Sequence, residues 1–277
     1  MAALSVVVAL AAGAYAQLGL ERLQSGRDIG RQLIYLPNGR YLRVASLGFA
    51  PVLADLIYLW SIQYYAAYDR TVRYDIVEHI YVHVIGELDP HYTDAYLLAS
   101  LILSVEARDP ERALYVLDVG IERNPGNWLL PFEAGFVAFS MLQDYERAGE
   151  YYRRCAAIPG SPAVARRFHA EMYNRMGDKR TSYAKWREVY ETAEDEFVRE
   201  VAYSHVHDLH IEIDLETLQV EVEKYRELHG RYPEGLEALV REGQMAELLL
   251  NPEGHSYAYD PATGEVGSKS KFRLWRR

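Results

Sequence analysis

One pattern recurs along the middle of this chain: a small residue is followed four positions later by a large apolar one. The three pairs are Ala113 and Leu117, Ala148 and Tyr152, and Ser182 and Trp186. Their first members lie 35 and 34 residues apart. Residues four apart share one face of a helix. A helical pattern with a period of about 34 residues predicts stacked helical hairpins, because no hairpin buries its apolar face until a neighbour covers it.

Two similar segments indicate where the second helix of a repeat begins. Residues 109–113 read Asp-Pro-Glu-Arg-Ala and residues 144–148 read Asp-Tyr-Glu-Arg-Ala. Aspartate is a favoured N-cap, and acidic side chains stabilise the first turn of a helix. Prolines at 90, 125 and 159 recur with the same period and separate the repeats, since proline cannot continue a helix. Residues 92–105 and 128–142 are therefore expected to form first helices.

The small, large and proline positions together resemble the tetratricopeptide repeat (TPR) family over about residues 74–192. The resemblance implies an all-α solenoid of helical hairpins whose groove holds a peptide or helix from another protein. Tyr96, Trp128 and Phe132 are the candidate partner-binding residues on the first helices. For Trp128, a place in the core is an equal alternative. The single cysteine, Cys155, lies in an apolar stripe and is expected to be buried.

Charge and motif content exclude several function classes. The formal net charge of −10 argues against nonspecific nucleic-acid binding, which depends on Lys and Arg at phosphates. Histidines at 205, 207 and 210, and at 79 and 83, lack a metal-site pattern and are expected at surfaces or between helices. With no ordered nucleophile, base and orienting group, the sequence predicts no enzyme and no metal or other cofactor.

The first twenty residues contain no charged side chain. A helix of that length spans about 30 Å, which matches the hydrocarbon core of a bilayer, so a single-pass anchor is expected. A cleaved secretory signal ending near Ala14-Tyr15-Ala16 and a buried core helix are the alternatives. Arginines at 22, 27, 31, 40 and 43 place the following segment in the cytoplasm by the positive-inside rule.

The segment between the anchor and the repeats differs from both. Asn38-Gly39 lies between apolar stretches, which predicts a tight turn in a small β-ribbon over residues 33–44. Residues 47–68 predict a helix that is apolar on most sides and needs covering by protein or lipid. It is either a cap on the first repeat or a docking element near the membrane. Asp55 on this helix requires a hydrogen-bonding or charged partner.

The last part of the chain changes character at about residue 215. Apolar positions over 215–229 predict an amphipathic helix that ends at Gly230 and Pro233, followed by a short helical stretch over 234–248. Residues 256–259 and 265–268 alternate in the manner of a β-hairpin. The five basic residues of the tail form either a solvated end or a contact with lipid headgroups. They are Lys269, Lys271, Arg273, Arg276 and Arg277.

The C-terminal segment resembles the C-terminal part of the major pseudopilins of type II secretion. The resemblance rests on Tyr225, on His-Gly-Arg-Tyr-Pro at 229–233, on Gly-Leu-Glu-Ala-Leu at 235–239 and on Tyr-Ala-Tyr-Asp-Pro at 257–261. The prepilin cleavage site of that family is not visible here. The resemblance implies an extracytoplasmic setting, which opposes the arginine pattern after the anchor.

The predicted organisation has four parts. They are an anchor or signal segment (1–23), a membrane-proximal hairpin and apolar helix (24–73), TPR-like repeats (74–214) and a C-terminal helix and β-hairpin module (215–277). The predicted function is a membrane-tethered scaffold or adaptor that binds a protein or peptide within a larger complex. The expected location is the bacterial inner membrane, with the soluble part in the periplasm. The alternative is a structural component of an envelope secretion or pilus-like assembly.

Overall fold

The computed structural model describes residues 36–67 and 74–270. The predicted anchor and most of the basic tail lie outside the described residues. Contacts divide the chain into two compact units on either side of the Asn124–Pro125 bond, inside the predicted repeat region, and each unit is described by itself. None of the helices in the described ranges is long and apolar enough to cross a membrane.

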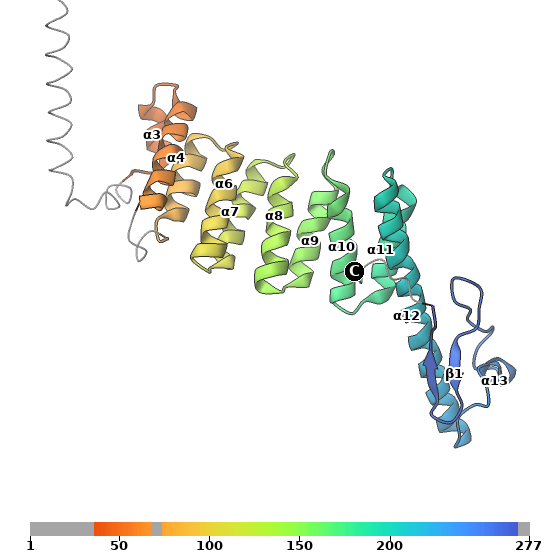
Figure 1. The fold of residues 1–277 in the computed structure, drawn as a ribbon. Helices are drawn as coiled ribbons and strands as arrows, with labels where there is room; N and C mark the ends of the chain where they lie inside the picture. Colours follow the sequence, from red (N-terminus) through yellow and green to blue (C-terminus); the bar gives the residue numbers. More distant parts are fainter. Residues whose placement is uncertain (1–35, 68–73, 271–277) are drawn as a thin grey trace, which may run out of the picture. The chain divides into compact units, whose positions relative to one another are not determined.

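The first unit consists of helices joined by short loops (Figure 1). Two of its stretches, η1 and η2, are π-helical, and α5 is a short α-helical extension of η1. The elements are α3 (Gly39–Ala45), α4 (Ala50–Ala67), η1 (His79–Ile85), α5 (Gly86–Leu88), α6 (Thr93–Leu101), η2 (Ile102–Glu106) and α7 (Pro110–Arg123). The helix formed by α6 and η2 packs against α7, as the first and second helices of one repeat.

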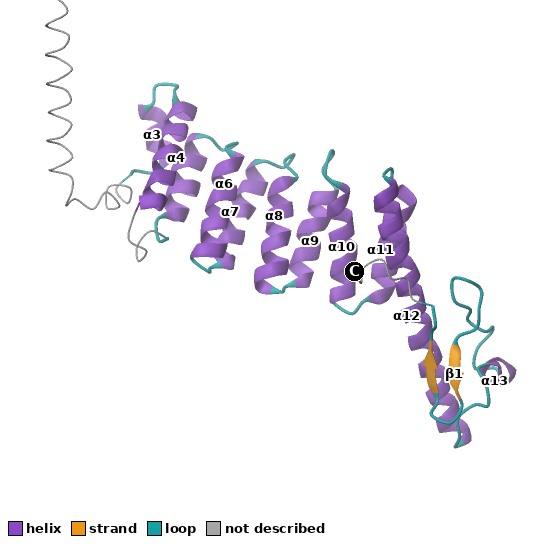
Figure 2. Cartoon of the chain, viewed as in Figure 1, coloured by secondary structure: helices purple, strands orange, loops and turns teal. Residues whose placement is uncertain are grey.

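The second unit continues the pattern and adds a small mixed module (Figure 2). Its elements are α8 (Leu129–Val137), η3 (Ala138–Leu142), α9 (Tyr145–Ala156), α10 (Ala163–Arg175), α11 (Lys179–Thr192), α12 (Glu196–His229), α13 (Glu237–Arg241), β1 (Ala258–Asp260) and β2 (Glu265–Gly267). From α8 to α12, each helix packs on the next. The prediction of a mostly helical chain of hairpins is confirmed.

The small and large residues of the repeated pairs lie in the core, as predicted. All six side chains are buried, on the second helices α7, α9 and α11. Cys155 is buried on the same stripe of α9. Ser182, which replaces alanine in the third pair, donates its hydroxyl to the carbonyl of Ala170 at 2.9 Å. That bond satisfies the buried hydroxyl, so the substitution preserves the packing.

The loop before each second helix repeats at the level of the backbone. Asp109, Asp144 and Asp178 are N-caps whose side chains accept hydrogen bonds from the amides of residues 112, 147 and 181, at 3.0–3.1 Å. The preceding residue adopts the left-handed conformation in every case, at Arg108, Gln143 and Gly177. Only the third of these is glycine, the residue that favours this conformation. The sequence therefore did not predict the left-handed conformation, although it did predict the caps at Asp109 and Asp144.

Two helix pairs place an aromatic ring directly on a glycine. A Cβ atom at Gly120 of α7 would lie 2.9 Å from the ring of Tyr96 on α6. A Cβ atom at Gly135 of α8 would lie 2.8 Å from the ring of Tyr152 on α9. Any other residue at these two positions would force the helices or the rings apart.

The predicted β-ribbon over residues 33–44 is wrong, because residues 39–45 form α3. Asn38 is the N-cap of this helix, with its side chain accepting from the amide of Arg40 at 3.0 Å. Gly39 is present because a Cβ there would overlap the carbonyl of Val84. Asn38 therefore starts a helix, and Gly39 permits a close approach of the backbone. The same dipeptide is also common in tight turns, which is why the sequence suggested one. The part of the predicted ribbon before residue 36 lies outside the described residues.

Helix α4 confirms the predicted apolar helix over 47–68, with one face covered by protein. Ile57, Ser61 and Tyr64 are buried, and the Ser61 hydroxyl shares a 2.9 Å hydrogen bond with Tyr81 of η1. Asp55 has the required partner, since the hydroxyl of Tyr92 hydrogen-bonds to its carboxylate. The other face of α4 is exposed.

The C-terminal module packs on the second half of α12. The predicted amphipathic helix over 215–229 is the end of this 34-residue helix, which runs through residue 215 without a break and ends at Gly230 with φ 68°. The short helix α13 covers five residues of the predicted stretch 234–248. The predicted hairpin is present as an antiparallel pair with Tyr259 opposite Val266. Tyr257 donates to the buried carboxylate of Asp214 at 2.8 Å.

A buried histidine joins the loop before β1 to α12. His207 is only 2% exposed, and its ring nitrogens lie 2.6 Å from Glu253 Oε1 and 3.1 Å from Asp208 Oδ1. Burial alone would lower the pKa of His207, but the two carboxylates raise it above its ordinary value. The folded state therefore binds this proton more tightly than the unfolded state does.

Substituting two buried glycines of the second unit is expected to have opposite effects. Gly135→Ala should lower the free energy of unfolding by about 1–3 kcal/mol, because the methyl group would overlap the Tyr152 ring. Gly149→Ala should raise it by roughly 0.5–1 kcal/mol, because a Cβ there meets Met172 at an ordinary 3.4 Å and alanine favours the helix. Urea titrations followed by circular dichroism give both values. Equal effects of the two substitutions would contradict the ring-on-glycine packing.

The contact between His207 and Glu253 should make the loop at residues 251–255 sensitive to pH. Its stabilising effect is complete below the ordinary histidine pKa of about 6.5 and is lost as pH rises through the raised pKa. Glu253→Gln should therefore lower amide protection factors in this loop at about pH 6, and much less at about pH 8.5. The control is Glu234→Gln, which removes an exposed ion pair with Arg231. A pH-independent effect of Glu253→Gln would count against the ion pair.

Candidate functional site

An aromatic cluster joins α8, α9 and α10 in the second unit. Trp128 and Phe132, both predicted as partner-binding residues, contact each other with ring centroids 6.3 Å apart. Phe132 lies 6.1 Å from Phe168 of α10, and Tyr152 stacks on Phe168 at 5.0 Å. Trp128, Phe132 and Phe168 are partly exposed. The two predicted residues thus form one continuous aromatic surface with Phe168, which the sequence analysis did not single out.

Tyr96, the third predicted binding residue, is not available to a partner. Its side chain is fully buried on Gly120, and its hydroxyl donates to the carbonyl of Pro90 at 3.2 Å. Arg123 donates to the same hydroxyl at 3.1 Å and to Glu87 at 2.6 Å. The groove role of Tyr96 is therefore corrected to a core role, because a first-helix aromatic that meets a glycine turns inward. Binding by Trp128 and Phe132 stays a prediction.

A hollow of about 210 Å³ opens beside this aromatic surface. Three helices supply its walls: α10, α11 and α12. The lining residues are Val164, Arg167, Phe168, Glu171, Trp186 and His205. Val164, Arg167, Phe168 and Glu171 follow one another at spacings of one and three on α10, so they share a helical face.

The back wall of the hollow is a stacked pair of rings. Trp186 of α11 and His205 of α12 have centroids 3.9 Å apart and planes within 6° of parallel. Burial lowers the pKa of His205 and outweighs the nearby Glu171 carboxylate, which raises it. The imidazole is therefore neutral near pH 7, which suits a flat stack on an indole ring.

Three polar atoms at the hollow are buried without a hydrogen-bond partner among the residues that the structure describes. They are Arg167 Nε, Glu171 Oε2 and Trp186 Nε1. Burial lowers the pKa of Arg167. The other oxygen of Glu171 accepts from Arg175 at 2.9 Å. Unsatisfied buried polar atoms are uncommon, because each one costs free energy in the unliganded protein.

The residues that line the hollow carry two N–H groups and one carboxylate oxygen that are buried without partners in the described part of the chain. A few polar groups between apolar walls are the arrangement that orients a ligand in a binding site. The volume of the hollow is below the roughly 300 Å³ of small-molecule pockets, so it suits one or two side chains of a larger ligand.

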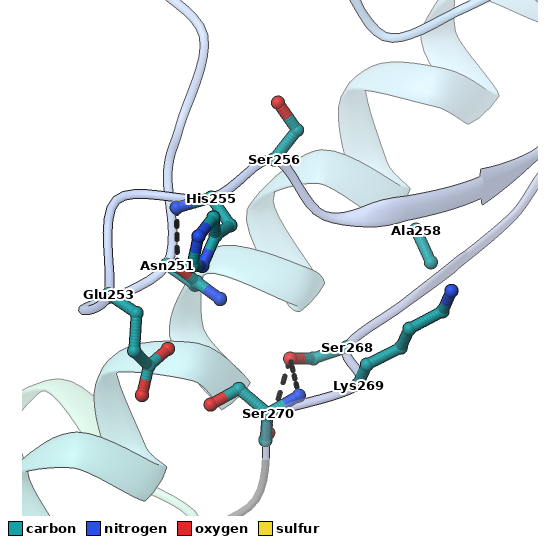
Figure 3. A pocket seen from close by; sticks show the side chains of 8 residues that line it. All are labelled: Asn251, Glu253, His255, Ser256, Ala258, Ser268, Lys269 and Ser270. Atoms are coloured by element: carbon teal, nitrogen blue, oxygen red, sulfur yellow. Dashed lines mark hydrogen bonds between the residues drawn. The ribbon is translucent and has the colours of Figure 1, made fainter.

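A second hollow, of about 440 Å³, lies in the C-terminal module (Figure 3). The loop before β1, the first residue of β1 and the segment after β2 line it with Asn251, Glu253, His255, Ser256, Ala258, Ser268, Lys269 and Ser270. Its polar groups serve the loops themselves: the amide of His255 donates to Asn251 at 2.7 Å, and Glu253 contacts His207. These contacts hold the turns of the module together and point to no ligand.

The other histidines of the sequence analysis take structural places. A ring nitrogen of His79 lies 2.9 Å from the carbonyl of Leu36, and the rings of His79 and His83 are 6.4 Å apart. His210 Nε2 lies 3.3 Å from Asp214 Oδ2 on the same helix. Within residues 36–67 and 74–270, no group of three or more metal-ligating side chains is positioned to hold an ion.

Comparisons with known proteins give only distant likenesses. No family model matches the chain, and no curated protein matches it. A solved structure described as the crystal structure of MamA protein has a TM-score of 0.42 and 14% identity, over 73% of this chain and 100% of that one. TTC0263, described as a thermophilic TPR protein in Thermus thermophilus, has a TM-score of 0.34 and 21% identity, over 55% of this chain and 98% of that one. At these scores neither likeness carries an argument, so the hairpin architecture rests on the helix packing of the chain itself.

The pKa values of His205 and His207 on α12 should lie on opposite sides of the ordinary histidine value of about 6.5. We expect the pKa of His205 to be lower, because burial opposes its charge, and the pKa of His207 to be higher, because two carboxylates stabilise its charge. Side-chain NMR titration of the full chain measures both. Spectra of His205→Gln and His207→Gln assign the signals, and two pKa values on the same side of about 6.5 would contradict the environments described.

Proposed function

We propose that this chain is a non-catalytic adaptor of the TPR type, and that it holds a peptide segment of another protein in the hollow between α10, α11 and α12. The observation that carries the proposal is the set of three polar atoms at an otherwise apolar hollow that are buried without partners in the described part of the chain. A ligand that satisfies them recovers the free energy that their burial costs.

A peptide group fits this set of atoms. Its carbonyl oxygen accepts from the N–H groups of Arg167 and Trp186, and its N–H donates to Glu171. A neighbouring apolar side chain fills the space along Val164 and Phe168, within the available 210 Å³. The next residues of the peptide extend over Phe132 and Trp128, whose partly exposed rings continue the same surface.

The proposal includes a membrane tether and a place in a multi-protein complex. The uncharged residues 1–20 support a single-pass anchor in a bacterial inner membrane. The pseudopilin-like segment supports a periplasmic position for the repeats. Peptide binding by the repeats then recruits a partner to the membrane surface.

Binding should depend on Arg167. Peptides of about ten residues, selected from a displayed random library on the full chain, provide the probe. Arg167→Gln should weaken binding of the selected peptides at least tenfold, because a hydrogen bond from a charged donor contributes about 1.5–3 kcal/mol. Arg187→Gln should change the affinity less than twofold, since Arg187 is exposed on α11 and pairs with Glu191.

Peptides that bind Arg167→Gln as tightly as the unchanged chain would place recognition elsewhere, and failure to select any peptide would contradict the proposal. Point variants serve this test better than a truncation before residue 215, which would cut α12 in the middle. Circular dichroism of both variants shows that the fold is intact.

A further inference from the structure

Exposed apolar side chains are concentrated in α3, α4 and the turn between them. Among the described residues, eight of the twenty large apolar side chains that are exposed lie within residues 41–62, while the other twelve are spread over residues 101–250. The eight are Tyr41, Val44, Leu47, Phe49, Val52, Leu56, Leu59 and Ile62. Scattered exposed apolar residues are ordinary, but a contiguous set of this size marks an interaction surface.

Four of the eight, Val52, Leu56, Leu59 and Ile62, follow one another at spacings of three and four along α4, so they form a stripe on one side of the helix. Phe49, which directly precedes α4, extends the stripe at the same spacing. The stripe is about 20 Å long at 1.5 Å per residue. The opposite side of α4 packs on η1. A helix held by protein along one face and apolar along the other is suited to lie on a surface.

The polar groups beside the stripe are compatible with a lipid surface. Asp55, the one acidic residue between positions 38 and 67, hydrogen-bonds to Tyr92. Arg40 and Arg43 on α3 are exposed, and Arg40 also pairs with Glu87 at 3.0 Å. This basic segment stands out in a chain with a net charge of −10. Arginines exposed on α3, the helix that precedes the apolar stripe, favour anionic headgroups over a neutral protein partner.

We propose that the α4 stripe lies in the interfacial region of a lipid bilayer, with Arg40 and Arg43 at anionic headgroups. This inference rests on the proposed tether. Residues 24–38 separate the predicted anchor segment from α3 and reach at most about 50 Å when extended, so the tether keeps the stripe close to the bilayer. This contact holds one face of the first unit toward the membrane. An anchor joined by a flexible linker keeps the unit near the membrane but does not set its orientation.

A fluorophore at position 59 tests the contact. The full chain with Leu59→Cys is labelled with an environment-sensitive dye and reconstituted into vesicles of phosphatidylcholine and phosphatidylglycerol. Leu101→Cys on α6 is the matched control, because Leu59 and Leu101 are both 56% exposed on helices of the first unit. The native Cys155 does not compete for the label, since it is buried and burial raises its pKa to about 11.

The dye at position 59 should shift its emission to shorter wavelength and lose at least half its intensity when the lipids carry acyl-chain quenchers. The dye at position 101 should do neither. Vesicles of phosphatidylcholine alone should give weaker quenching at position 59, and equal quenching would overturn the role of the arginines.

Other outcomes overturn the inference in different ways. A water-like emission at position 59, with the chain co-floating with the vesicles, would overturn the bilayer contact and leave the tether standing. Shifted but unquenched emission would show that protein covers the stripe, either a second copy or another segment of this chain. A chain that does not co-float would overturn both the tether and the contact, while peptide binding by the second unit would be unaffected.

Discussion

The helix pairs depend on close approach at positions with little or no side chain. Tyr96 lies on Gly120 and Tyr152 lies on Gly135, so a large ring fills the space that a Cβ atom would occupy. In the third pair, Ser182 is small enough to reach the backbone of Ala170. Because interiors are close-packed, each such contact sets the separation of two helices and hence the position of every residue on them. The contact between Ser182 and Ala170 joins α10 and α11, two of the three helices that wall the hollow.

Between the helices, the loops impose a second repeated constraint. An aspartate N-cap follows a left-handed residue before α7, α9 and α11, although the left-handed residue is arginine, glutamine or glycine. The cap hydrogen bonds satisfy amides that have no partner in the first turn of a helix. The same reversal of the chain therefore precedes each second helix.

Two histidines on opposite sides of one turn of α12 show opposite solutions to polar burial. His207 is enclosed by carboxylates that stabilise its charge, and it secures the C-terminal module to the helix. His205 is stacked on Trp186 and kept neutral by burial, beside polar atoms that lack partners in the described part of the chain. Satisfied polar groups build structure, whereas the unsatisfied ones beside the hollow are the physical basis of the recognition that we propose.

Local sequence patterns predicted the helical hairpins, the buried small and large pairs, and the caps at Asp109 and Asp144, because these patterns involve residues only a few positions apart. The C-terminal β-hairpin was predicted from alternating residues and turn residues, which are also local in the sequence. Tertiary structure decided which aromatic residues point outward: Tyr96 meets a glycine and turns inward, while Phe132 joins Phe168 across two helices. It also converted the expected Asn38-Gly39 turn into a helix start, since the approach of Val84 is a contact over 45 residues that no local pattern encodes. The candidate site combines residues of three helices, and only their packing brings Arg167, Trp186 and His205 together.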